Sequence, residues 1–261
     1  MRLDRFIQRQ LVCSAYTTRH LLAGRKIRVN GMAAADGRQP ITAFCRIEVD
    51  GKLLQAREPV YLMMHKPRGC VSATTDLKNT TVLDLIDLPA KHALHLAGRL
   101  DFNSTGLLLL TNDGNWSRRI TLPHQKIPKT YRVETKGEIT AAHVKQFAEG
   151  IYFAYENLTT RPALLTIHSA HTAELTLFEG RYHQIKRMFG FFQNEVVGLH
   201  RLSMGEIVLD DNLAPGEYRH LTAAEIASVQ HRPVANGRVA QTGKDPITGS
   251  AHPVQRSGNH P

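Results

Sequence analysis

The sequence predicts an α+β protein in which a small helix–helix–hairpin unit precedes a larger domain, built on a largely antiparallel mixed sheet with flanking helices. Segments with strand character outnumber those with helix character, and they do not follow the strict βαβ order of a parallel sheet. With 261 residues and 42% hydrophobic content, the chain can bury a sizeable core. Residues 232–261 contain four Pro, four Gly and few large apolar side chains, so we expect a disordered tail.

The positive charge lies at the two ends of the chain. Residues 1–57 hold 11 Lys and Arg against 4 Asp and Glu, whereas residues 58–231 hold 18 of each kind. Clustered Lys and Arg release counterions from a phosphate backbone, which favours a polyanionic partner. We therefore predict a basic unit over residues 1–57 that binds a polyanion, a neutral body over 58–231 and a tail over 232–261.

The first residues predict two short helices. Leu3, Phe6, Ile7 and Leu11 form one apolar stripe at helical spacing, with Arg2 outside it. In the next segment, Thr17 or Thr18 can cap a second helix, and Gly24 is expected to end it in a left-handed conformation.

A hairpin follows these helices. Residues 26–29 alternate with a period of two and run into Asn30-Gly31, a dipeptide suited to a tight turn; we expect residues 46–49 to form the returning strand. The run RLDRFIQRQLVCS followed by LLAGRKIRVNG resembles the S4 RNA-binding domain. The sequence departs from that pattern at Ala15 and Tyr16, where such domains often carry Arg after the Ser. This departure shifts the expected RNA contacts toward Arg19, Arg25, Lys26 and Arg28, and Arg2 is a further candidate.

The larger domain shows strand and helix patterns in mixed order. Apolar runs or alternation predict strands over residues 61–64, 106–111, 131–135, 163–167, 173–178 and 207–209. Caps and helical spacing predict helices over residues 140–148 and 182–192, and a third that opens with a capping box at Thr222.

The densest polar segment is the loop GRLDFNST, which contains Asp101 and precedes an apolar strand. A rigid sheet edge can aim such a carboxylate. On its own, however, an Asp before Asn-Ser-Thr is more typical of a turn or a cap. We interpret Asp113-Gly114 as a hairpin turn.

Four blocks in order resemble the pseudouridine synthases of the ribosomal small-subunit synthase family: LMMHKPRG, GRLD before a Gly-Leu-rich strand, KTY and EGRYHQIKRM. The resemblance implies isomerisation of uridine to pseudouridine in RNA, without a cofactor or metal. It implies that Asp101 is the catalytic carboxylate, that Tyr131 stacks on the flipped base, and that Lys186 pairs with Asp101. A nearby ammonium favours the ionised carboxylate.

The same resemblance assigns further basic residues. Arg99 is a candidate for filling the gap that the flipped base leaves, and Arg181 and Arg187 are candidate phosphate contacts or solvated helix residues. His183 belongs to the last block, although a single His in such a position is usually structural.

Several other classes of protein are less compatible with the sequence. The three Cys include no Cys-x-x-Cys pair, which disfavours a disulfide framework or a zinc site. A metal-dependent nuclease using Asp101 and Asp113 would need to bridge a strand of about 20 Å. No long apolar run or secretory pattern is evident, so we expect a cytoplasmic protein. We also expect a monomer. A noncatalytic ribosome-assembly factor remains an alternative.

The choice of RNA depends on the last block. Tyr182-His183 and Lys186 resemble the small-subunit branch of the family, whereas the large-subunit branches tend to have Asn-Arg and Arg at these places. We therefore expect one uridine of 16S rRNA as the target, with 23S rRNA as the alternative.

Overall fold

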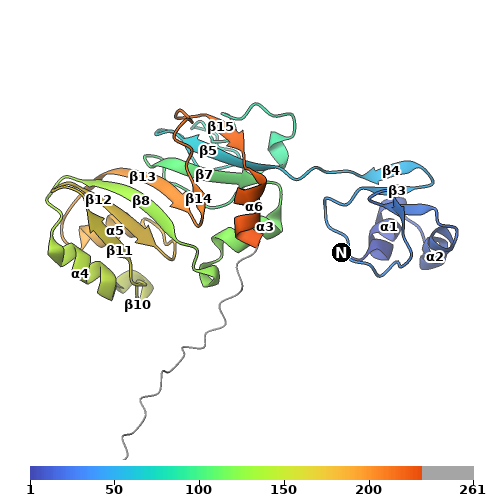
Figure 1. The fold of residues 1–261 in the computed structure, drawn as a ribbon, viewed down its shortest axis with the longest axis horizontal. Helices are drawn as coiled ribbons and strands as arrows, with labels where there is room; N and C mark the ends of the chain where they lie inside the picture. The colour runs from blue at the N-terminus through green and yellow to red at the C-terminus, as the bar shows by residue number, and fades with distance from the viewer. Residues whose placement is uncertain (231–261) are drawn as a thin grey trace, which may run out of the picture.

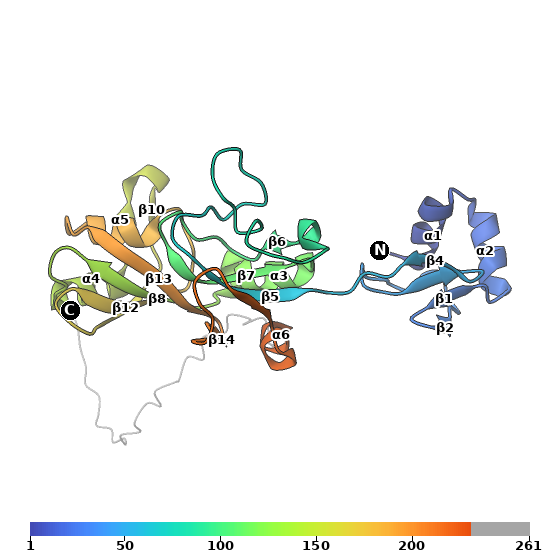
Figure 2. The ribbon, with the colours of Figure 1, turned by 90° about the horizontal axis from the view of Figure 1, so that it is seen from above.

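The computed structural model describes residues 1–230 and confirms the α+β class. Two units, each with its own sheet, are joined by the extended residues 56–60 (Figures 1 and 2). The expected tail, residues 232–261, lies outside the described residues. No helix in the described part of the chain is long and apolar enough to cross a membrane.

The small unit consists of two helices packed on a four-stranded sheet in the order β2-β1-β3-β4. Its elements are α1 (Leu3–Leu11), α2 (Ala15–Ala23), β1 (Ile27–Val29), β2 (Met32–Ala33), β3 (Ile47–Val49) and β4 (Lys52–Gln55). The predicted stripe of α1 enters the core, where Leu3, Phe6 and Ile7 pack against Ile27 and Ile47. Burial of this apolar stripe holds the first helix on the sheet.

Three local expectations for the small unit were wrong in detail. Ser14, rather than a Thr, caps α2, because its hydroxyl accepts from the backbone N–H of Thr17 at 3.1 Å. Gly24 has φ −74°, and Arg25 takes the left-handed conformation instead. The Asn30-Gly31 turn leads into β2, whereas β3 pairs with the other edge of β1.

The large unit is built on a nine-stranded sheet whose main path runs β11-β12-β8-β13-β7-β5-β15. Its strands are β5 (Tyr61–Lys66), β6 (His95–Leu96), β7 (Thr105–Thr111), β8 (Lys129–Thr135), β11 (Leu164–Ile167), β12 (Thr172–Leu177), β13 (Val196–Met204), β14 (Ile207–Val208) and β15 (Tyr218–His220). A separate hairpin pairs β9 (Tyr152–Phe153) with β10 (Leu158–Thr159). Strands β7 and β13 pair in parallel at the centre, and the other named strands pair antiparallel.

Four α-helices and three short 3₁₀ turns accompany this sheet. They are α3 (Gly114–Thr121), α4 (Ala141–Glu149), α5 (Gln184–Gly190), α6 (Ala223–Gln230), η1 (Lys91–Ala93), η2 (Pro123–Gln125) and η3 (Ala154–Glu156). The predicted caps are confirmed for α4 at Thr140 and for α6, where Thr222 and Glu225 bond reciprocally. The prediction of a hairpin turn at Asp113-Gly114 was wrong. Asp113 instead caps α3, because its side chain accepts from the backbone N–H groups of Asn115 and Trp116.

The two halves of the sheet are buried differently. Strands β5 and β7 are covered on both faces, with Met63 and Leu107 in one core and Leu62 and Leu108 in another. Double burial explains the continuous apolar run of β7. In the other half, one face packs against α4 and α5, while alternate residues of β8 such as Arg132 are exposed.

Candidate active site

A cavity of about 450 Å³ opens where the two halves of the sheet meet. Its walls are the loop 98–104, strands β8 and β13, and residues 179–186 at the start of α5. Four segments that are separated in sequence therefore converge on one concave site. The predicted residues Asp101, Tyr131 and Lys186 all line it.

Backbone anchors on both sides of Asp101 hold its loop. The hydroxyl of Ser72 donates to the carbonyl of Leu100 at 2.7 Å and accepts from its N–H at 3.1 Å. The fully buried Lys66 ammonium donates to the carbonyl of Ser104 at 2.9 Å and to that of Phe102 at 3.4 Å. Burial lowers the pKa of Lys66, since desolvation disfavours the charged form.

Gly106, shortly after the Asp101 loop, allows strands β7 and β13 to pair closely in parallel. It has φ +102°, and a Cβ at this position would lie 2.3 Å from the carbonyl oxygen of Arg201 on β13. No side chain fits into that space, so only glycine permits β7 and β13 to approach at this point.

Two basic side chains, Lys186 and His183, face the Asp101 carboxylate from one end of α5. Lys186 Nζ lies 3.9 Å from Asp101 Oδ2, and His183 Nε2 lies 3.4 Å from the same oxygen. His183 precedes α5 in a left-handed conformation (φ 49°), and the two residues are three apart, which places them on one side of the helix. The Asp101 side chain is one-third exposed and is therefore accessible from the cavity.

Tyr131 forms the opposite part of the cavity from strand β8. The residue is 8% exposed and packs with Leu100 and Ile185 in the core of this half. Its cross-strand neighbour on β13 is Arg201. This position leaves the ring as a rigid wall of the cavity.

Arg181 and Arg187 lie beside the cavity but are engaged by protein carboxylates. Arg181 Nη1 contacts Glu156 at 3.0 Å, and its Nε contacts Glu179 at 3.2 Å. Arg187 also pairs with Glu156 and stacks 3.6 Å above the ring of Phe153. The hydrogen bond from Arg187 is the main reason that the pKa of Glu156 lies below its usual range. An RNA phosphate would have to compete with these pairs.

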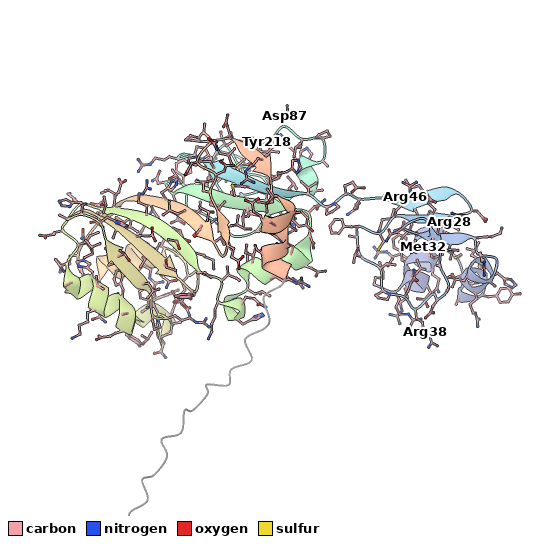
Figure 3. All side chains as sticks on the ribbon, in the orientation of Figure 1. Arg28, Met32, Arg38, Arg46, Asp87 and Tyr218 are labelled. Carbon is pink, nitrogen blue, oxygen red and sulfur yellow. The ribbon has the colours of Figure 1, made fainter. Side chains whose placement is uncertain are left out.

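The basic residues predicted in the small unit lie on its surface. Arg19, Arg25, Lys26 and Arg28 are exposed. Lys26 contacts Asp50 at 3.2 Å, and Arg28 donates to the carbonyl of Gly31 at 3.1 Å. Figure 3 shows Arg28 and Arg46 at the sheet of this unit.

The remaining predicted arginines are also accessible. Arg2 is exposed and pairs with Asp4, two residues away. Arg99 is exposed at the cavity, two residues before Asp101. These basic residues do not converge on one site, since Arg99 belongs to the large unit.

Sequence reasoning missed two cationic side chains in the cavity wall, Lys129 and Arg201. Burial, and next the nearby Arg201, lowers the pKa of Lys129 to about 8. Lys129 stands in the KTY block, so its place was visible in the sequence although its environment was not. Arg201 lies in a segment for which no strand was predicted.

Comparison with known proteins gives this site a family. A model of the RNA pseudouridylate synthase family matches residues 60–190, which contain Asp101, Tyr131 and α5. The chain belongs to the RNA pseudouridylate synthase family. Family membership makes it an RNA pseudouridine synthase, with RNA as its partner.

Individual family members match over most of the chain. The chain is 51% identical over 230 residues to a ribosomal small subunit pseudouridine synthase A of Pseudomonas aeruginosa, covering 88% of this chain and 100% of that protein. A protein of the same name from Escherichia coli is 43% identical with the same coverage. A crystal structure of a pseudouridylate synthase is 40% identical and superimposes with a TM-score of 0.65 over 88% of this chain and 99% of that one.

The described part of this synthase holds no group of three or more His, Cys, Asp and Glu that could bind a metal ion. Asp113, the partner of Asp101 in the nuclease alternative, caps α3 and accepts a hydrogen bond from the Tyr61 hydroxyl at 2.9 Å. The side chain of Asp113 is therefore used in the fold, at the opposite end of β7 from Asp101.

Proposed function

We propose that this synthase isomerises one specific uridine of 16S rRNA to pseudouridine, with Asp101 as the catalytic carboxylate. The observation that carries this proposal is the convergence of Asp101, Tyr131 and Lys186 in one cavity. The cavity has room for a nucleobase taken out of the RNA stack.

The geometry suits the chemistry of the isomerisation. The N-glycosidic bond breaks, the uracil turns, and a carbon–carbon bond to the sugar forms. A carboxylate can attack or stabilise the anomeric carbon as positive character develops there, or accept a proton during rearrangement. Asp101 is accessible, anchored through its loop and accompanied by Lys186 at 3.9 Å. Tyr131 offers a flat face to the flipped base.

Recognition of the RNA is assigned to the small unit, which we propose is an S4-like RNA-binding domain over residues 1–57. Its basic side chains are exposed, as phosphate contacts require. Residues 58–231 would then form the catalytic domain. We expect the protein to be a monomer and to act in the cytoplasm on ribosomal RNA.

The choice of 16S over 23S rRNA is supported by two observations. The last sequence block has the Tyr-His and Lys of the small-subunit branch, and relatives with 88% coverage of this chain are named small-subunit synthases. In the structure, Tyr182 stacks on His183 with ring centroids 3.8 Å apart, at the cavity. Of the residues that differ between branches, His183 and Lys186 stand beside Asp101, and Tyr182 stacks on His183.

Pseudouridine mapping in a deletion strain tests this function. Both rRNAs are mapped in the strain without the gene, and again after restoring wild type or Asp101→Asn. We expect one 16S pseudouridine to disappear, to return with wild type and to stay absent with Asp101→Asn. A site lost from 23S rRNA, with an unchanged 16S pattern, would refute the assignment of substrate. Restoration by Asp101→Asn would refute the role of Asp101. No lost site in either rRNA would favour the noncatalytic assembly factor.

A further inference from the structure

Arg201 is a buried cation in the cavity wall with an unused hydrogen-bond donor. The residue is 1% exposed, its Nε donates to the carbonyl of Leu107 at 2.7 Å, and its Nη1 reaches the carbonyl of Arg99 at 3.4 Å. Its Nη2 is buried without a partner, and no ion pair within residues 1–230 includes this guanidinium.

A guanidinium in this state is costly to the folded protein. Buried charges are normally paired, and buried donors normally find an acceptor, because otherwise their lost hydration is not replaced. The neighbouring Lys129 adds a second cation, and Arg201 is one cause of the lowered pKa of Lys129. The unfavourable arrangement would be relieved by an electron-rich group inside the cavity.

The sheet register places this donor next to the expected base. Arg201 on β13 pairs with Tyr131 on β8 in the antiparallel ladder, so their side chains leave the same face of the sheet. Its contact with the carbonyl of Arg99 places the guanidinium beside the loop of Asp101. A base lying on Tyr131 would therefore have one edge toward Arg201.

The isomerisation produces the charge that such a donor can stabilise. The electron pair of the N1–C1′ bond passes to the uracil, which turns and forms the C5–C1′ bond. C5 then loses its proton and N1 takes one up, so composition and oxidation state do not change. Between the two bond changes, the ring carries negative charge on its O2 and O4 oxygens.

We infer that Arg201 is a further catalytic residue, whose Nη2 donates to a carbonyl oxygen of the flipped uracil and stabilises the ring as the glycosidic bond breaks. This inference rests on the proposed function. Preorganised donors at developing oxyanions act strongly in a water-excluded site. Removal of the charge in Arg201→Gln should lower the single-turnover rate about 100- to 1000-fold, while RNA affinity stays that of wild type.

The decisive experiment pairs protein variants with modified substrates. Single-turnover rates are measured with RNA whose target uridine is unmodified, 2-thio or 4-thio, for wild type, Arg201→Gln and Arg201→Lys. Sulfur is a weaker acceptor than oxygen, so one thio-substrate should be slow with wild type. That slowing should vanish in Arg201→Gln, because groups in contact give non-additive effects. Arg132→Gln, which changes an exposed residue on the opposite face of β8, is the control and should behave as wild type.

Each outcome has a defined meaning. Equal thio effects in wild type and Arg201→Gln would overturn the inference, even if Arg201→Gln were slow, because loss of structure alone would not change that ratio selectively. Should Arg201→Gln fail to fold, as shown by thermal unfolding, the same comparison is made with Arg201→Met, which also lacks the charge and has no donor. Wild type that does not convert unmodified uridine would instead refute the proposed function.

Discussion

The predicted RNA-binding cations of the small unit and two cations in the cavity of the large unit lie in opposite environments. In the small unit, Arg19, Arg25 and Arg28 are exposed to solvent. In the cavity of the large unit, Arg201 is 1% exposed and the pKa of Lys129 is lowered to about 8 by burial. Similar residue types therefore experience a high dielectric in one unit and a low dielectric in the other.

Cations in these two environments serve two separate tasks, RNA binding and conversion of the uridine. Exposed cations attract phosphates over a distance, but salt screens them, and their effect is on affinity. Buried cations act only on a group that enters the cavity, where electrostatic interactions are stronger. We accordingly expect changes in the small unit to alter RNA affinity, and changes in the cavity to alter the rate of conversion.

The largest separation of RNA affinity from the rate of conversion is expected from the triple substitution of Arg25, Lys26 and Arg28 by Ala. Each lost phosphate contact lowers the slope of log affinity against log salt by about 0.7 to 0.9. The slope should therefore fall by about two to three units, while the single-turnover rate at saturating RNA stays unchanged. Filter binding over a range of salt concentrations measures the slope.

A matched control for this triple variant is available in the large unit. Lys136 and Lys145 are exposed cations away from the cavity, and their substitution by Ala should leave the slope near that of wild type. An unaltered slope in the triple variant would place the RNA footprint outside the small unit. A reduced rate at saturating RNA would show that the two tasks are not separate.

A smaller effect is expected at the ion pair of Asp101 and Lys186. Both side chains are at least one-third exposed, so the pair at 3.9 Å is worth about 1 kcal/mol, or roughly fivefold in rate. Lys186→Met should slow conversion by that factor. Lys186→Arg should retain most activity because the charge remains. Equal losses in both variants would show that shape matters rather than charge.

Local signals in the sequence predicted those parts of the fold that depend on local physics. Thr140 and Thr222 begin helices because their side chains satisfy free N–H groups, and the stripe of α1 enters the core because the spacing matches a helix. Strand β13 was missed because register shifts between residues 196 and 198 and between 201 and 203 interrupt its two-residue alternation. Alternation is the signal that identifies a half-buried strand.

In the candidate site, too, some residues could be predicted from the sequence and others depend on tertiary structure. Asp101, Tyr131 and Lys186 were predicted from the resemblance, because each stands in a compact sequence block. Arg201 was not, because its burial and its proximity to Tyr131 arise from pairing between strands that are 70 residues apart in sequence. The contact of His183 with Asp101 also depends on tertiary packing, because a left-handed residue turns the chain into α5.

A further expected effect, on stability rather than on rate, concerns the pH dependence at Lys129. Its pKa is about 8 in the folded protein, below the 10.4 of an unfolded chain, so the unfolded state binds more protons between these values. Stability from this residue is therefore lowest below pH 8 and rises up to about pH 10.4. Lys129→Met should be more stable than wild type at pH 7, and the difference should shrink as pH rises. Thermal unfolding of both proteins from pH 7 to 10 measures it, and a constant difference would contradict the cause assigned to the shift.

The separation of RNA affinity from conversion is tested most directly by Asp101→Asn, which removes one negative charge from the cavity and preserves its shape. Affinity and pseudouridine formation are measured on the same 16S rRNA fragment, with wild type in parallel. The expected result is affinity and salt dependence equal to wild type, together with complete loss of pseudouridine formation. Substantial turnover by Asp101→Asn, or a loss of affinity that matches the loss of turnover, would contradict the account.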